Sequence, residues 1–261
     1  MKGAIIGDII GSAFINENLK STDFQLFRPT SAFTDDTVLT MATADSILNG
    51  TDYQTSLANW VKKYPNAGYK KSFLNWIRGD RTEAYVSEGD GAARRISPIG
   101  FAAQNIEEAL HEAEKSTILT HNVPIRVEAS KAAAVSIFMA KSGATRKDIK
   151  SFVSVHFGYD LTLKAEHWRQ KINQNNRLNT PVPAALSAFF EASDFEEAIR
   201  IAIYIGGPSN TIASITGALA QAYFQHIPKA FIKRALARLT PDMETLIENF
   251  ETKYLQTSEA S

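Results

Sequence analysis

The sequence contains no cysteine, which excludes disulfide bonds and thiolate chemistry. This absence is compatible with a reducing compartment, and we expect a cytoplasmic protein. The 28 basic and 28 acidic residues cancel, so the composition gives no indication of a nucleic acid partner. No apolar run reaches the roughly 18 residues needed to cross a bilayer. We therefore expect no membrane association either.

What the sequence does contain is a helical pattern, beginning with its first residues. The segment MKGAIIGDIIGSAF (1–14) is apolar except for Asp8, and we interpret it as a buried helix rather than a signal peptide. Gly3, Gly7 and Gly11 recur every four residues and therefore share one face of this helix. Such a face allows another backbone to approach closely.

Further helices are predicted from capping residues and from apolar spacing. The predicted helices span 35–48, 52–63, 105–116, 124–142, 145–156, 161–170, 182–192, 194–204, 211–225, 229–237 and 240–255. The residues expected at their N-terminal caps are Thr34, Asp52, Asn105, Asp194 and Thr240. No run of alternating β-branched residues extends over several strands, so the predicted fold is all-α.

The chain of 261 residues, 44% of them hydrophobic, is long enough to bury one large core. We predict a single compact domain over 1–255 and a flexible tail over 256–261. The segment 78–104 is predicted to be a long loop, and long loops in a compact helical domain are often binding sites.

Two adjacent aspartates, Asp35 and Asp36, follow Thr34 in the motif FTDDT. In the first turn of a helix these carboxylates interact favourably with the helix dipole, which is an ordinary structural role. The same residues also offer the carboxylate and hydroxyl oxygens that Mg²⁺ or Ca²⁺ prefers. A metal site would need a second group of ligands from elsewhere in the chain.

Three other motifs each have a structural and a functional interpretation. GGPSNT (206–211) is either a tight turn capped by Ser209 or Asn210, or an anion site at a helix N-terminus. SEGDGAARRISPIG (87–100) is either a surface turn or a loop whose exposed backbone N–H groups hold a phosphate. His121 precedes a predicted helix, where a histidine is more often structural than catalytic.

Taken in order, these motifs resemble those of the ADP-ribosylglycohydrolase family over nearly the whole chain. The matching segments are GAIIGDIIGS (3–12), FTDDTVLTMA (33–42), YPNAGY (64–69), GDGAARRISPIG (89–100), THN (120–122) and GGPSNTIASITGALAQAY (206–223). The resemblance implies a single compact orthogonal helical domain with a binuclear Mg²⁺ centre. It also implies hydrolysis of the glycosidic bond between ADP-ribose and an acceptor.

The resemblance assigns a role to each candidate site residue. The metal ligands would be Thr34, Asp35, Asp36, Asn210 and Thr211. The catalytic residues would be Asp36 and Glu17, and the substrate-binding residues Ser87, Gly89, Asp90, Gly91, Ala92 and His121. ADP-ribose or an ADP-ribosylated protein would be the partner if the site is functional.

The chain departs from the family pattern where chemistry would occur. The usual Gly-Asp-Ser/Thr-Asp-Thr segment is replaced by 207–211, GPSNT, and both aspartates are lost. A usual glutamate falls on Ile15, so Glu17 can substitute for it only if the loop is shifted. Asp90 stands where the family has asparagine, and Arg94 where it has methionine.

These departures predict a degenerate family member with weak or no hydrolase activity. The two remaining aspartates suit one Mg²⁺ ion at most, because two divalent ions with half their carboxylates would repel each other. The alternative is a working hydrolase with a remodelled, one-metal site. A further alternative is a metal-free binder of anions with a basic rim of Lys70, Lys71, Arg94 and Arg95.

Overall fold

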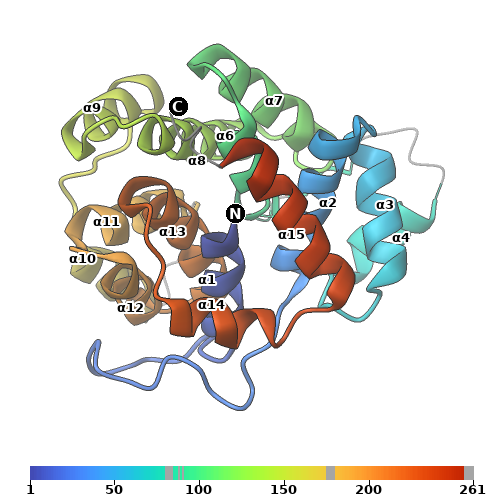
Figure 1. Cartoon of the computed structure of the whole chain (residues 1–261). Helices are drawn as coiled ribbons and strands as arrows, with labels where there is room; N and C mark the ends of the chain where they lie inside the picture. Colours follow the sequence, from blue (N-terminus) through green and yellow to red (C-terminus); the bar gives the residue numbers. More distant parts are fainter. Residues whose placement is uncertain (80–84, 88, 90, 175–179, 256–261) are drawn as a thin grey trace, which may run out of the picture.

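The computed structural model describes residues 1–79, 85–87, 89, 91–174 and 180–255, and every regular element in these ranges is a helix (Figure 1). The predicted all-α fold is therefore confirmed. The helices are α1 (Lys2–Ser12), α2 (Asp35–Asn49), α3 (Tyr53–Lys63), α4 (Lys71–Arg78), α5 (Gly91–Arg94), α6 (Ser97–Ala102), α7 (Ile106–Ile118), α8 (Pro124–Lys141), α9 (Arg146–Phe157), α10 (Ala165–Asn173), α11 (Val182–Glu191), α12 (Phe195–Ile205), α13 (Ser209–Phe224), α14 (Lys229–Leu236) and α15 (Pro241–Tyr254).

The first helix, α1, lies at the centre of the molecule with α13 packed along it (Figure 1). Residues 3–11 are all buried, as expected for a helix that is apolar on every side. The predicted close backbone approach is confirmed on the glycine face of α1. A Cβ placed on Gly3 would lie 2.1 Å from the carbonyl oxygen of Gly217, and one on Gly217 would lie 2.2 Å from that of Gly3.

Four of the five predicted N-caps form the expected hydrogen bond. The side chains of Thr34, Asp52, Asn105 and Asp194 each accept a backbone N–H from the first turn of the helix that follows. Thr240 occupies the N-cap position of α15, but its hydroxyl donates to the Asp242 carboxylate at 2.7 Å and makes no capping bond. Local sequence therefore sets where most of these helices begin.

The prediction of a long loop over 78–104 is wrong, because the segment contains α5 and α6. The short helix α6 starts with Ser97 and Pro98 and is buried against α8. A Cβ on Gly100 would lie 2.6 Å from the Ala134 carbonyl oxygen, so only glycine allows this approach. Tertiary packing thus stabilises a helix that is too short for periodicity to reveal. The helix α4, which buries Phe73 and Ile77, was also not predicted.

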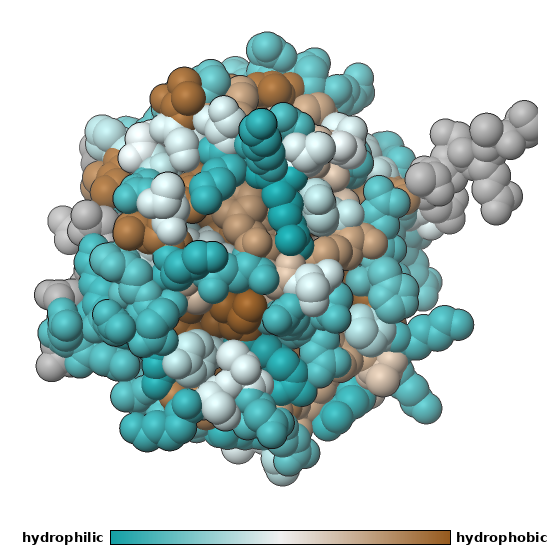
Figure 2. Space-filling model, turned by 90° about the vertical axis from the view of Figure 1, so that its left-hand side faces the viewer, coloured by the Kyte–Doolittle hydropathy of each residue, from teal (hydrophilic) through white to brown (hydrophobic). Residues whose placement is uncertain are grey.

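The side of the molecule that carries α9 to α12 shows small groups of hydrophobic residues separated by hydrophilic ones (Figure 2). Within the described ranges, no helix is both long enough and apolar enough to cross a membrane. The tail predicted to be flexible, 256–261, lies outside the described residues.

Candidate functional site

A buried carboxylate, Asp8, joins three helices at the candidate site. It accepts hydrogen bonds from the backbone N–H and hydroxyl of Thr34 at 2.8 and 2.7 Å. It also accepts from the N–H and hydroxyl of Thr37 at 3.2 and 2.6 Å, and from the amide of Asn210 at 3.3 Å. Sequence reasoning did not include Asp8 among the site residues. The sequence could have pointed to Asp8, because it is the one acidic residue within an apolar helix that is predicted to be buried, and such a charge needs polar partners.

The FTDDT aspartates lie in the first turn of α2, where the Arg94 guanidinium binds both of them. Arg94 Nη2 is 2.7 Å from Asp35 Oδ2, and Nη1 is 3.3 Å from Asp35 Oδ1. Nη1 also forms an ion pair with Asp36 Oδ1. The Asp36 side chain is fully buried, whereas the Asp35 side chain is 13% exposed. A single arginine therefore neutralises part of the charge of both aspartates.

The second predicted metal segment meets Asp36 with donor groups. The Asn210 amide donates to Asp36 Oδ2 at 3.1 Å, and the Thr211 hydroxyl donates to the same oxygen at 3.2 Å. The Ser209 hydroxyl donates to the Gly11 carbonyl oxygen at 2.9 Å. The predicted cap by Ser209 or Asn210 is wrong, because α13 starts at Ser209 and Pro208 occupies its cap position without a capping bond.

The acidity of the cluster is set by burial and by Arg94. Burial raises the pKa of the Asp35 carboxyl, and Arg94 offsets part of this rise. Burial likewise raises the pKa of the Asp36 carboxyl well above its usual range, with Arg94 again opposing the change. Burial alone would lower the pKa of Arg94, but the charges of Asp36, Asp35 and Asp8 outweigh it and raise that pKa. The guanidinium is therefore a permanent positive charge in the site.

The side chains present do not fit a binuclear Mg²⁺ centre. Each of the four carboxylate oxygens of Asp35 and Asp36 contacts a guanidinium, amide or hydroxyl group. Asn210 donates from its amide and supplies no negative charge. In the described part of the chain, no group of three or more histidine, aspartate or glutamate side chains is arranged to hold a metal ion.

Beside this cluster lies a cavity of about 180 Å³ that brings several predicted residues together. The predicted residues that line it are Asp35, Ser87, Gly89, Gly91, His121 and Thr211. Lys70, Arg94 and Arg95 line it as well and add positive charge. Ala92 is buried in α5 and does not line the cavity. Asp90 lies outside the described residues.

A chain of hydrogen bonds fixes the orientation of His121 in this cavity. Buried Arg95 donates to the Thr120 hydroxyl at 3.0 Å, and that oxygen is 2.7 Å from His121 Nδ1. The Thr120 hydroxyl accepts from Arg95 and keeps its own proton, which it can donate to Nδ1. Burial lowers the pKa of His121 to about 2, with Arg95 and Arg94 adding to the effect. We infer a neutral imidazole with its proton on Nε2.

The neutral state of His121 predicts a loss of stability in acid. Its pKa is lower in the folded chain than the ordinary value of 6.5, so unfolding takes up a proton below that pH. The contribution is fully present above pH 6.5 and is lost as the pH falls from there towards 2. We expect His121 to account for about 2 kcal/mol of lost unfolding free energy at pH 5. Urea unfolding as a function of pH measures this loss.

The control for this prediction is His226→Gln, which removes an exposed imidazole. His121→Gln should remove about 2 kcal/mol of the pH dependence between pH 7 and pH 5, and His226→Gln should leave it unchanged. Equal pH profiles for wild type and His121→Gln would contradict the neutral buried state.

Glu17 is not brought together with the other predicted catalytic residue. Its carboxylate lies 2.6 Å from Arg28 Nη1, is 41% exposed and does not line the cavity. Ile15, which takes the place of the usual glutamate, is 43% exposed. The catalytic roles of Glu17 and Asp36 remain predictions from the family resemblance.

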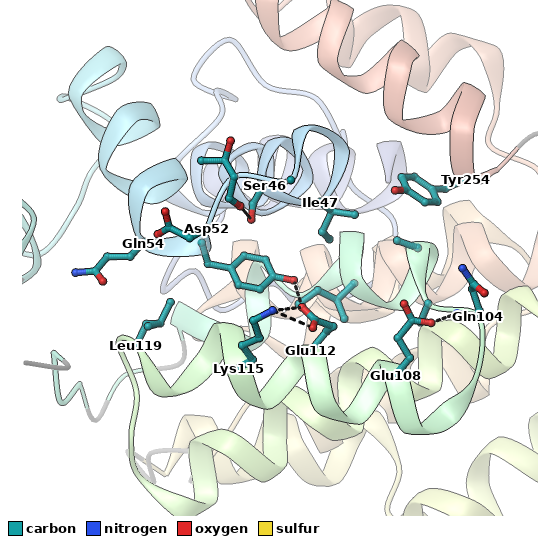
Figure 3. A pocket seen from close by; sticks show the side chains of 16 residues that line it. Ser46, Ile47, Asp52, Gln54, Gln104, Glu108, Glu112, Lys115, Leu119 and Tyr254 are labelled. Carbon is teal, nitrogen blue, oxygen red and sulfur yellow. Dashed lines mark hydrogen bonds and ion pairs between the residues drawn. The ribbon is translucent and has the colours of Figure 1, made fainter.

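A cavity of about 720 Å³ lies elsewhere, between α7 and the α2–α3 connection (Figure 3). Its acidic side chains have partners within the protein. Glu112 accepts from the Tyr53 hydroxyl at 2.8 Å and pairs with Lys115 at 3.1 Å, and Glu108 accepts the N–H of Gln104 at 2.9 Å. Of the family motifs, the segment 89–100 reaches this cavity through Ile99, and no candidate site residue lines it. We therefore take the smaller cavity beside Asp35 as the candidate functional site.

The fold and site define an all-helical protein with a buried carboxylate cluster where α1, α2 and α13 meet. The ADP-ribosylglycohydrolase family model matches residues 1–259, and the chain belongs to this family. The expected resemblance is thus confirmed.

Individual relatives agree with this membership at low sequence identity. The chain is 21% identical to the ADP-ribosylarginine hydrolase Tri1 of Pseudomonas putida, over 85% of this chain and 68% of the relative. It is also 21% identical to the ADP-ribosylhydrolase ARH3 of Gallus gallus, over 86% of this chain and 84% of the relative. A solved structure titled ADP-ribosylglycohydrolase-related protein complex superimposes with a TM-score of 0.70 at 22% identity, covering 97% of this chain and 96% of that one.

Proposed function

We propose that this protein is a degenerate member of its family that binds an ADP-ribose-like ligand and has weak or no hydrolase activity. The observation that carries the proposal is the replacement of the second metal segment by donor groups. The two aspartates usual in this segment are replaced by Pro208 and Asn210, and the Asn210 amide donates to Asp36 where a carboxylate ligand would be needed. A two-metal clamp on the reacting oxygens cannot be built from these side chains.

Binding remains supported by the positive charges of Lys70 and Arg95 at the cavity. Among the described residues, neither Lys70 nor Arg95 forms an ion pair with a carboxylate. Arg95 is 1% exposed, and burial together with the nearby Arg94 charge lowers its pKa to about 10. A buried cation such as Arg95 is unfavourable without a counter-ion, so a phosphate group in the cavity would be stabilised.

The size of the cavity limits which part of the ligand it can take. Its volume of about 180 Å³ is below the range of roughly 300–1,000 Å³ that is usual for whole small-molecule sites. We propose that the phosphate and ribose end enters beside Lys70 and His121, while the rest of the ligand stays outside. The neutral His121 would donate from Nε2 to the bound group.

The test is calorimetric titration of ADP-ribose into the protein, once with Mg²⁺ and once with EDTA, beside a hydrolysis assay. The assay substrate is a protein that carries ADP-ribosylated arginine. We expect ADP-ribose to bind and no release of ADP-ribose above the protein-free rate. Mg²⁺-dependent release that is abolished by Asp36→Ala would instead establish a working metal-dependent hydrolase.

Lys70 and Lys71 offer a matched pair of variants for the binding arm. Both lysines are exposed, but only Lys70 lines the cavity. Lys70→Glu should weaken ADP-ribose binding by about tenfold or more, since it replaces a charge-assisted contact with repulsion. Lys71→Glu should leave the affinity within about twofold. Equal effects of the two substitutions would remove the cavity from the proposed function.

A further inference from the structure

Arg94 occupies the place between the two aspartates where a metal ion would have to bind. It reaches this place from the last position of α5, which begins at Gly91. A Cβ on Gly91 would lie 3.5 Å from Arg94 Nη2 and 3.1 Å from His121 Cε1. The backbone carbonyl of Arg94 in turn accepts from the Thr40 hydroxyl of α2 at 3.4 Å. The guanidinium is therefore positioned by the protein scaffold rather than by a surface loop.

The guanidinium and a divalent ion compete for the same atoms. Arg94 already contacts both oxygens of Asp35 and Oδ1 of Asp36. The remaining oxygen, Asp36 Oδ2, accepts from Asn210 and Thr211. A metal ion would have to displace these donors and would lie beside a fixed positive charge, which repels it strongly at such short range. The planar guanidinium, in contrast, matches carboxylate geometry.

We propose that Arg94 is the permanent counter-ion of Asp35 and Asp36, in the place of the family's metal ions. The site is then assembled without any divalent ion, and its charge cannot be removed by a chelator. This proposal links two departures from the family pattern, the loss of the aspartates at 208 and 210 and the presence of Arg94. One positive charge in place of two divalent ions needs fewer carboxylates to balance it. This inference does not depend on which ligand enters the cavity.

Metal uptake by the wild-type protein is the first measurement. Mn²⁺ is titrated into the protein, and the electron paramagnetic resonance signal measures the free ion. The wild-type protein should bind no more Mn²⁺ than the Asp35→Asn variant does. The melting temperature should be the same with Mg²⁺ and with EDTA. Uptake of Mn²⁺ that depends on Asp35 would overturn the proposal, whether or not the protein has hydrolase activity.

Arg94→Met is the second measurement, because it restores the residue usual in the family. In EDTA its melting temperature should fall by several degrees, as two nearly buried carboxylates lose their counter-ion. Mn²⁺ or Mg²⁺ should restore part of the loss, and Mn²⁺ uptake should appear. The double variant Arg94→Met, Asp35→Asn should show neither response.

Arg28→Met is the matched control, since it removes an arginine from the exposed carboxylate of Glu17. It should create no response to metal. A folded Arg94→Met protein that ignores Mn²⁺ would contradict the proposal. So would a variant that stays unfolded in both buffers, because a metal ion should replace the missing charge.

Discussion

Replacing Asp8 with alanine is expected to lower the free energy of unfolding by about 3–5 kcal/mol. The carboxylate is fully buried and accepts from both the N–H and the hydroxyl of Thr34 and of Thr37. The hydroxyls can rotate towards other acceptors, but the two backbone N–H groups cannot. Without Asp8, those N–H groups of the α2 N-terminus lose their acceptor, and the oxygens of Asp35 and Asp36 already contact Arg94, Asn210 and Thr211.

An opposing effect reduces this loss but does not cancel it. Asp8 lies near Asp35 and Asp36, and its charge raises the pKa of both. Removing it therefore relieves some repulsion. Arg94 already offsets part of that repulsion, whereas nothing else offsets the lost hydrogen bonds of 2.6–2.8 Å. We expect the lost hydrogen bonds to dominate.

Urea unfolding of Asp8→Ala beside Asp23→Ala measures the effect. Asp23 is exposed, so its substitution should change the unfolding free energy by no more than about 0.5 kcal/mol. Asp8→Asn should give an intermediate loss of unfolding free energy. The asparagine keeps one acceptor oxygen, but its amide NH₂ faces the donor groups of Thr34 and Thr37. If Asp8→Ala is no more destabilising than Asp23→Ala, the carboxylate does not hold the three helices together.

The parts of the fold that depend on short-range sequence could be predicted. Asp52 and Asn105 were predicted as caps because a side-chain oxygen three residues before a free N–H is a local arrangement. The close packing on α1 followed from glycines at every fourth position. The helices α5 and α6 were missed, since their few residues are stabilised by contacts with α8 and α2 that local sequence does not contain.

The candidate site was predictable as a set of motifs and not as a set of contacts. The motifs FTDDT, SEGDGAARRISPIG (87–100) and THN (120–122) indicated which residues would meet, and Asp35, Gly91 and His121 do line one cavity. The sequence marked Arg94 as a departure but could not tell that its side chain would lie between Asp35 and Asp36. Glu17 lies two residues after Ile15, the position of the usual glutamate, so the sequence offered it as a substitute. In the structure its carboxylate accepts from Arg28 instead and stays outside the site.

Replacing Gly7 with alanine should destabilise the protein by about 3 kcal/mol or more, despite the better helix propensity of alanine. An added Cβ would lie 2.0 Å from the carbonyl oxygen of Ala213 and 2.4 Å from its carbonyl carbon. Both atoms belong to the backbone of α13, so no side chain can rotate away. The intrinsic gain is about 1 kcal/mol, whereas separating two buried helices costs packing along their whole contact.

Gly79→Ala is the control for this prediction, because it makes the same chemical change where there is space. Its added Cβ would meet the carbonyl oxygens of Asn75 and Trp76 at 3.5 Å, which is ordinary contact. We expect a change within about 0.5 kcal/mol there in urea unfolding followed by circular dichroism. Similar stabilities of the two variants would mean that α1 and α13 can move apart at little cost. In that case the position of Asn210 against Asp8 and Asp36 would not be fixed by the glycine face of α1.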